Sequence, residues 1–268
     1  MALEIRLLDL GDIEAERSQV VLGRSPGGNV RVPTFGHLIL GGRSPILVDT
    51  GYRNPASLED LGMTGHRDPH QELEQQLALH NVELNDVGAV INTHLHLDHG
   101  GQNDKFPLST PVITNRKELE FAASGLDGAL YSADDVKHMI DRLFTPNALR
   151  LLDLERSGPI EVFPGITCDV AGGHTEGSMI VLVQTASGVA CICGDLIYDV
   201  GDQLETPVGQ LLVDEPAPIS NSPRSRRDEI AAIKRAAKMG QFLLPMHDRP
   251  AVMEEGRVAG RLTDRVPA

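Results

Sequence analysis

The sequence has no tryptophan, only nine other aromatic residues (three Tyr and six Phe) and three cysteines among its 268 residues. Cys168, Cys191 and Cys193 are odd in number and lack CxxC spacing, which argues against a disulfide framework and a thiolate metal site. We therefore expect a reducing compartment, the cytoplasm. The amino-terminus lacks a basic segment followed by an unbroken apolar run, so no secretory signal is visible, although a processed chain would look the same.

Long apolar runs and an excess of positive charge are also missing. The longest apolar runs, such as Met179–Val183, fall far short of the roughly 20 residues that a membrane span requires. Lys and Arg number 24 against 38 Asp and Glu, which gives a formal net charge of −14. Because an acidic chain repels a phosphate backbone, we expect no nucleic-acid partner, and because no run could span a bilayer, we expect no membrane partner.

Short apolar runs alternate with helical patterns, which is typical of an α/β fold. No repeat or long linker interrupts the chain, so we expect a single domain over residues 1–268. Strand-rich halves, each with helices, suggest two sheets packed face to face, although periodicity alone does not select this over a doubly wound sheet. The apolar runs are Ile5–Leu10, His37–Leu40, Ile46–Val48, Val87–Asn92, Pro111–Thr114, Ile160–Phe163, Ile166–Val170, Met179–Gln184, Val189–Cys193 and Phe242–Pro245. Helices are predicted from Asp68, from Asn115, over Ala133–Phe144 and over Arg226–Met239, the last closed by Gly240.

The histidines carry most of the functional information. Four potential ligands, His94, His96, Asp98 and His99, fall within six residues directly after a predicted strand, in HLHLDHGG. In an extended stretch His94 and His96 point to the same side, and Asp98 and His99, at the turn into the two glycines, can face a second point. Imidazole and carboxylate ligands without cysteine suit zinc, iron, manganese or cobalt. The spacing therefore predicts two neighbouring metal sites.

Three further candidates lie at strand ends downstream: His174 in AGGHTEGS, Asp195 in CICGDLIY and His247 in LLPMHD. Loops at strand ends are where proteins build sites. The seven residues together resemble the full ligand set of the metallo-β-lactamase superfamily, and Ile46–Gly51 (ILVDTG) resembles its early strand end. The resemblance implies a four-layer αββα sandwich, the metallo-β-lactamase fold, with a two-metal site at one edge of the sheets.

The resemblance also implies a role for each residue. His94, His96 and His174 would hold the first metal, Asp98, His99 and His247 the second, and Asp195 would bridge both. Asp49 would orient the histidine loop, as metal sites generally need. We expect two divalent ions per chain, with zinc as the leading candidate and iron, manganese or cobalt as alternatives. The other five histidines, His37, His66, His70, His80 and His138, are expected to be structural or surface residues, with the loop around His66 close enough to overhang the site.

Two adjacent metals activate a bridging water, so the set predicts hydrolysis by a metal-bridging hydroxide. The sequence contains no GxSxG motif, so it gives no indication of covalent serine catalysis. The β-lactamases themselves carry Cys or Ser where Asp195 stands. The spacing of Asp195 and Tyr198 instead resembles the quorum-quenching N-acyl homoserine lactone lactonases. That resemblance implies that Tyr198 supports the oxyanion and that Asp98 passes a proton to the departing alkoxide.

The expected substrate is thus a small lactone or ester, with an N-acyl homoserine lactone as the leading candidate. A glyoxalase II-like thioesterase or a phosphodiesterase of the same fold is the alternative. Flavodiiron-type chemistry would need a flavin domain, for which the sequence after His247 has no room. A homodimer stays open because the group contains monomers and dimers. Few aromatic residues can form a rigid acyl-binding wall, and the candidates are Phe35, Phe121, Tyr131 and Phe144.

Overall fold

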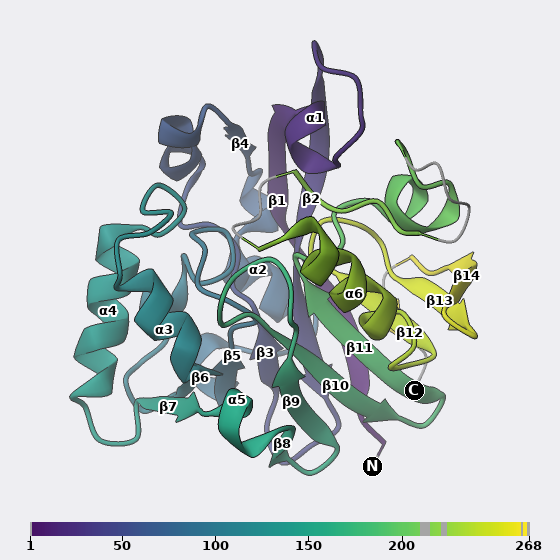
Figure 1. Ribbon diagram of the computed structural model, residues 1–268. Coiled ribbons are helices and arrows are strands. Elements are labelled where there is room, and N and C mark those ends of the chain that lie inside the picture. The colour runs from purple at the N-terminus through teal and green to yellow at the C-terminus, as the bar shows by residue number, and fades with distance from the viewer. Residues whose placement is uncertain (1, 210–214, 221–223, 264, 267–268) are drawn as a thin grey trace.

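Two β-sheets pack face to face and carry helices on their outer faces (Figure 1). The computed structural model describes residues 2–209, 215–220, 224–263 and 265–266. The first sheet has the order β15-β1-β2-β3-β5-β6-β7, and β4 pairs with β1. Its strands are β1 (Glu4–Glu16), β2 (Asn29–Leu40), β3 (Ile46–Val48), β4 (Thr64–His66), β5 (Ala89–Ile91), β6 (Val112–Asn115), β7 (Leu149–Leu152) and β15 (Arg265–Val266).

The second sheet has the order β14-β13-β12-β11-β10-β9-β8. Its strands are β8 (Ile160–Phe163), β9 (Ile166–Val170), β10 (Met179–Thr185), β11 (Gly188–Gly194), β12 (Phe242–Pro245), β13 (Ala251–Glu254) and β14 (Arg257–Arg261). In both sheets the central strands include parallel neighbours: β3 with β5 and β5 with β6 in the first sheet, and β11 with β12 in the second. The carboxyl ends of parallel neighbours meet at one edge, so the loops that follow them are brought together.

Helices cover both outer faces. The first sheet carries α2 (Leu73–Ala78), α3 (Arg116–Ala122) and α4 (Ala133–Leu143), and the second carries α6 (Arg226–Ala236). The shorter elements are α1 (Arg17–Val20), α5 (Leu154–Ser157), the 3₁₀ turns η1 (Pro55–Leu61), η2 (Pro69–Gln71), η3 (Leu84–Asp86) and η4 (Asn103–Lys105), and the π-turn η5 (Gly201–Glu205). The hairpin of β1 and β2 rises above the sandwich in Figure 1, with α1 at its tip.

Alternating strand residues supply separate apolar layers. Ile46 and Val48 of β3 face the core between the sheets, whereas Leu47 packs under the helices of the first sheet. Likewise Val181 of β10 faces the inter-sheet core and Ile180 faces α6. Such alternation, with period two, is what a strand buried on both faces requires. The αββα sandwich predicted from the sequence is therefore confirmed, and the doubly wound alternative is wrong.

Most predicted elements are present with bounds within one or two residues, including β8, β9 and β12, which agree at both ends. The strands β1 and β2 are longer than predicted, ending at Glu16 and beginning at Asn29. The single helix predicted from Asp68 is wrong: Asp68 caps the short turn η2, and the extended backbone of Glu72 separates it from α2.

The helix predicted over Arg226–Met239 is shorter in the structure, where it is α6. This helix ends at Ala236, and Gly240 lies beyond it, where a Cβ atom would come 2.5 Å from the Val189 carbonyl oxygen. Gly240 therefore serves close packing against β11. No helix in the described part of the chain is long and apolar enough to cross a membrane.

Candidate metal centre

The predicted ligands converge at one edge of the sandwich, on loops that follow strands. The segment after β5 carries His94 to His99, and the turn between β9 and β10 carries His174. Asp195 follows β11 directly, and His247 follows β12. His174 has a left-handed backbone (φ 66°), which is costly for a residue with a side chain and is typical of functional turns.

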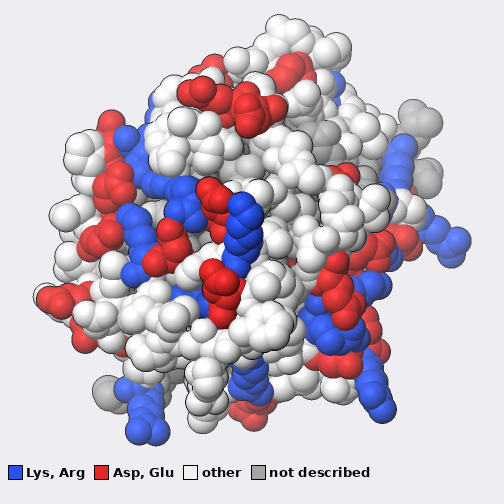
Figure 2. Space-filling view, turned by 90° about the vertical axis from the view of Figure 1, so that its left-hand side faces the viewer, with Lys and Arg blue, Asp and Glu red and all other residues white. Residues whose placement is uncertain are grey.

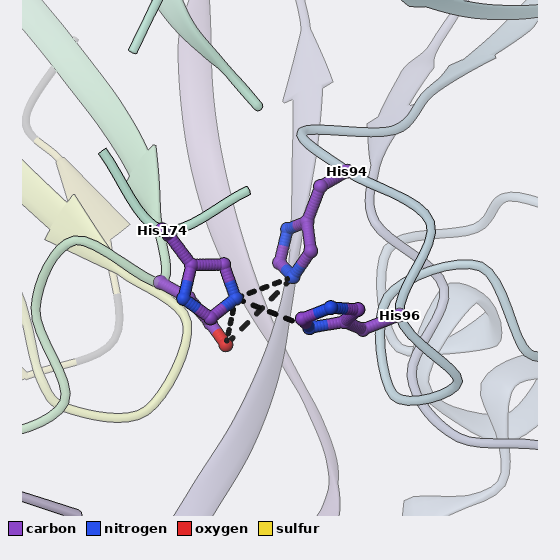
Figure 3. A group of neighbouring side chains, drawn as sticks. His94, His96 and His174 are labelled. Atoms are coloured by element: carbon purple, nitrogen blue, oxygen red, sulfur yellow. Dashed lines mark hydrogen bonds and ion pairs between the residues drawn. The ribbon is translucent and has the colours of Figure 1, made fainter. Parts of the chain in front are cut away.

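The first ligand group consists of His94, His96, His174 and Asp195. Figure 3 shows the three imidazole rings pointing toward a common centre. His174 Nε2 lies 3.1 Å from His94 Nε2 and 3.1 Å from His96 Nδ1. Asp195 Oδ2 completes the group at 3.5 Å from His174 Nε2 and 3.8 Å from His94 Nε2.

Charge explains why this group suits a cation. Burial lowers the pKa of His96 to about 3 and that of His174 to about 4, and it lowers the pKa of His94 as well. These rings are therefore neutral near pH 7 and present lone pairs. His94 Nδ1 donates to Thr93 Oγ1 over 3.2 Å, which leaves His94 Nε2 as an acceptor. Converging lone pairs beside a carboxylate fit a metal ion.

The second ligand group consists of Asp98, His99, His247 and again Asp195. Asp195 Oδ1 lies 2.8 Å from His99 Nε2 and 3.3 Å from His247 Nε2, and Asp98 Oδ2 lies 3.3 Å from His247 Nε2. Burial opposes the charging of His247, yet the two carboxylates raise its pKa to about 10. A metal ion would take the place of the protons that these carboxylates attract. Asp195 belongs to both groups, one oxygen toward each.

Buried acceptors behind the second group fix its imidazoles. His99 Nδ1 donates to Asp49 Oδ2 over 2.9 Å, and His247 Nδ1 donates to the Pro33 carbonyl oxygen over 2.9 Å. Asp49 also accepts from the Thr93 backbone and hydroxyl, at 2.8 and 2.7 Å. These bonds leave both Nε2 atoms facing the cluster, as a metal ligand requires. Asp49 thus lies where the sequence suggested, against the histidine loop.

The turn into the two glycines after His99 leaves no room for a Cβ atom at position 101. A Cβ atom on Gly101 would lie 2.2 Å from the Leu97 carbonyl oxygen and 2.6 Å from the Arg53 backbone nitrogen. Neither Gly100 nor Gly101 has a positive φ. Close packing against the Leu97 carbonyl and the Arg53 backbone, rather than a positive φ, therefore requires glycine at position 101.

Tyr198 lies against the cluster. Its hydroxyl donates to Asp195 Oδ2, and its ring stacks on His247 with centroids 4.5 Å apart and planes 10° apart. Burial, followed by the nearby carboxylates Asp195 and Asp98, raises the pKa of its phenol, so the hydroxyl stays protonated. The phenol is thus a hydrogen-bond donor at the mouth of the centre, where the lining of the pocket begins.

An apolar pocket opens onto this mouth. Its polar lining consists of Gln19 and four residues at the centre: His96, Asp98, Tyr198 and His247. The remaining lining side chains are aliphatic: Ile13, Ala15, Val20, Val32, Leu58, Leu61, Met63, Leu97, Leu130 and Ile219.

The sequence pointed to only part of this wall. Met63 belongs to the loop expected to overhang the site, whereas His66 of that loop contacts Glu14 instead. The candidate aromatic wall is wrong, since none of Phe35, Phe121, Tyr131 and Phe144 is among the described lining residues. Most of the wall comes from the β1–β2 hairpin, with α1 at its tip, and from η1. The sequence did contain one indication of this wall: apolar and polar residues alternate along Ile13–Ala15 and around Val32, as in a strand with one buried face.

Surface charge does not gather into a basic patch on the face that carries α3 and α4. Figure 2 shows Lys and Arg interspersed with Asp and Glu there. In the only dense basic run of the sequence, Ser225 caps α6 and Arg224 pairs with Glu176 at 2.8 Å. Arg224 thus contacts the rest of the fold, and the described lining of the pocket includes no residue of this run.

Comparison with known proteins gives the family. The model of the metallo-beta-lactamase superfamily matches residues 30–237. An N-acyl homoserine lactonase of Bacillus cereus is 31% identical over 193 residues, which cover 68% of this chain and 71% of that protein. A solved structure of a B. thuringiensis AiiA mutant with N-decanoyl-L-homoserine bound at its active site is 22% identical, with a TM-score of 0.68 over 88% of each chain. That of AidC, a dizinc quorum-quenching lactonase, is 16% identical, with a TM-score of 0.67 over 99% of this chain and 94% of that chain. The chain, with a His/Asp cluster that can hold two metal ions, belongs to the metallo-beta-lactamase superfamily.

Proposed function

We propose that this protein is a metal-dependent hydrolase that opens the ring of a lactone, with an N-acyl homoserine lactone as the leading substrate. The observation that carries the proposal is the aliphatic pocket beside the ligand cluster. An N-acyl homoserine lactone is uncharged and carries an acyl chain, which such a wall would bind by burial of apolar surface. The similarity to an N-acyl homoserine lactonase supports the same substrate class.

The pocket disfavours the alternative substrates. A phosphodiester is anionic, and a glutathione thioester carries carboxylates, so both call for cationic side chains near the reacting bond. No Lys or Arg is among the lining residues that the structure describes. The thioesterase and phosphodiesterase alternatives therefore rank below the lactonase.

We propose that the first ligand group holds one ion and the second group the other, with Asp195 bridging them. When bound, two such ions polarise a carbonyl and supply an activated water. Zinc is the proposed metal because imidazole and carboxylate ligands suit it and because a structurally similar lactonase is described as dizinc. We further propose that residues 1–268 form one domain. We propose the cytoplasm as the location of the protein, because its three cysteines are buried free thiols.

Two side chains act on the substrate in this proposal. Asp98 lines the pocket as the most exposed carboxylate of the cluster, with 14% of its side chain accessible, so it can pass a proton to the leaving alkoxide. Tyr198 lines the same pocket and can donate its hydroxyl to the oxyanion. His247 stacks on the Tyr198 ring and limits its movement.

A substrate panel tests the proposed function. The zinc-loaded protein should release one acid equivalent per N-acyl homoserine lactone in a pH-stat, and a longer aliphatic acyl chain should lower KM because the wall is apolar. Simple γ- and δ-lactones should react more slowly. Activity confined to glutathione thioesters or phosphodiesters would contradict the proposal.

Replacing Tyr198 by phenylalanine should lower kcat by about 10²-fold, the usual loss when one oxyanion donor is removed. The ring and its stacking on His247 remain, so the pocket keeps its shape. Kinetics and metal content should be measured on the same preparation.

Metal content separates two roles of the phenol, because its hydroxyl donates to Asp195 in the structure. Two retained ions with a reduced kcat support the oxyanion role. A loss of metal that accounts for the whole loss of rate would assign Tyr198 to holding Asp195 instead.

A further inference from the structure

Glu118 of α3 is a buried carboxylate that none of the roles above uses. It is fully buried, and its side chain reaches the loops that carry the histidines of the first ligand group. We propose that Glu118 is a positioning residue dedicated to the first ligand group. The inference rests on the metal centre of the proposed function, although not on the substrate.

One carboxylate oxygen holds the histidine loop. Glu118 Oε1 accepts from the backbone N–H of Leu95 over 2.9 Å, and Leu95 lies between His94 and His96. A bond at this position fixes the peptide that joins the two ligands. It therefore sets the direction in which both imidazoles leave the backbone.

The other oxygen holds the turn with the third histidine. Glu118 Oε2 accepts from the hydroxyl of Thr175 over 2.6 Å, the residue after His174. The turn lies so close to α3 that a Cβ atom on Gly177 would come 2.0 Å from the Glu118 backbone nitrogen. One side chain thus connects two loops that are about eighty positions apart in the chain, as His94 and His174 are.

A third contact reaches His96 itself. The Tyr131 hydroxyl donates to Glu118 Oε1 over 2.9 Å, and the Tyr131 ring packs edge-on against the His96 ring, with centroids 4.8 Å apart. His96 Nε2 is buried without a hydrogen-bond partner among the described residues. No hydrogen bond on that side fixes the ring, so packing against Tyr131, which Glu118 holds in place, orients His96.

The second ligand group is held by other acceptors. His99 donates to Asp49 and His247 donates to Pro33, and neither bond involves Glu118. Asp49 reaches both groups, because it also accepts from Thr93, the hydrogen-bond partner of His94. Glu118, by contrast, contacts only segments that carry ligands of the first group or pack against them. A carboxylate that only stabilised the fold would affect both groups equally, whereas a positioning residue would affect one.

Zinc affinity measured in two backgrounds tests this separation. His247→Ala disables the second group and His174→Ala the first, so each background reports on one ion. Glu118→Gln keeps the size of the side chain, but its amide nitrogen cannot accept a hydrogen bond. The Glu118 carboxylate accepts from the backbone N–H groups of Leu95 and Gly177 as well as from Thr175, and a backbone N–H cannot reverse its direction. We expect Glu118→Gln to weaken zinc binding by about 10- to 100-fold in the His247→Ala background, the usual effect of losing a group that orients a ligand. In the His174→Ala background we expect less than a twofold change.

Matched variants guard against a general loss of stability. Asp135→Asn removes another buried carboxylate, which pairs with Arg53 and contacts neither ligand group, and should leave zinc affinity unchanged in both backgrounds. Thr175→Val removes one bond without introducing an amide and should reproduce the effect of Glu118→Gln in part. Affinity is measured by competition with a chromophoric chelator, with thermal unfolding recorded for every variant.

Equal weakening in both backgrounds, or no weakening in the His247→Ala background, would overturn the inference. A protein that binds two zinc ions but opens no lactone would contradict the proposed substrate and leave this inference standing. A protein that binds no zinc would overturn both.

Discussion

Replacing Asp195 by asparagine is expected to reduce the metal content from two ions to one or fewer and to lower kcat/KM by at least about 10³-fold, because the paired ions create the nucleophile. Asp195 Oδ1 lies 2.8 Å from His99 Nε2, and Oδ2 lies 3.5 Å from His174 Nε2, so one side chain faces both groups. An amide presents one oxygen and one NH₂ group, and the NH₂ group would point at a cation. Elemental analysis after gel filtration gives the ion count, and hydrolysis of an N-acyl homoserine lactone gives the rate.

The control is Asp169→Asn, a second mostly buried carboxylate, which pairs with Arg235 on the outer side of the second sheet. It should keep two ions and most of the activity. The bridging role would be refuted if Asp195→Asn bound two ions as tightly as the unchanged protein. A retained ion count with a lost rate would place Asp195 in proton transfer instead.

The ligand set could be predicted because each member sits in a short local pattern. His94, His96, Asp98 and His99 follow one strand within six residues, so β5 alone brings them together. His174, Asp195 and His247 come from distant segments, and their meeting depends on the pairing of β9 to β12 in one sheet. The family resemblance supplied that long-range information, which strand-end position alone does not contain.

The pocket could not be predicted in the same way. Its wall depends on β1 extending to Glu16 and pairing with both β2 and β4, which brings Ile13 and Ala15 toward η1. Sequence patterns placed the first strand only as far as Leu10, because Gly11 and the polar residues after it interrupt the apolar run. Register across a long hairpin is a tertiary property, set by pairing rather than by local propensity.

Helix α4 also has a stabilising feature that the sequence alone could not predict. Its start was predictable, since Ser132 caps it by accepting from the Asp135 backbone. The complete burial of Arg142 in this helix could not be predicted, because arginine in an amphipathic pattern normally faces water. Only the structure shows the ring of backbone carbonyls that surrounds it.

Arg142→Met is expected to destabilise the fold by about 4 kcal/mol or more, since each buried acceptor left without a donor costs about 1–3 kcal/mol. All five N–H groups of the guanidinium are used: four reach backbone carbonyl oxygens and one reaches His138 Nε2. The carbonyls belong to Asn103, Phe106, Thr110 and Ala148. Thermal unfolding should show a fall in Tm of roughly 10 °C.

Charge and geometry can be separated at this position. None of the five acceptors is a carboxylate, so the guanidinium acts through its planar set of donors rather than through an ion pair. Arg142→Lys keeps the charge but offers only three donors from one atom, so it should recover less than half of the lost stability. The same change to methionine at the exposed Arg150, which donates once to the Val162 carbonyl oxygen over 3.4 Å, should cost no more than about 0.5 kcal/mol. Full recovery by lysine would show that buried charge, and not the five-donor geometry, joins α4 to the loops that follow the metal-binding segment.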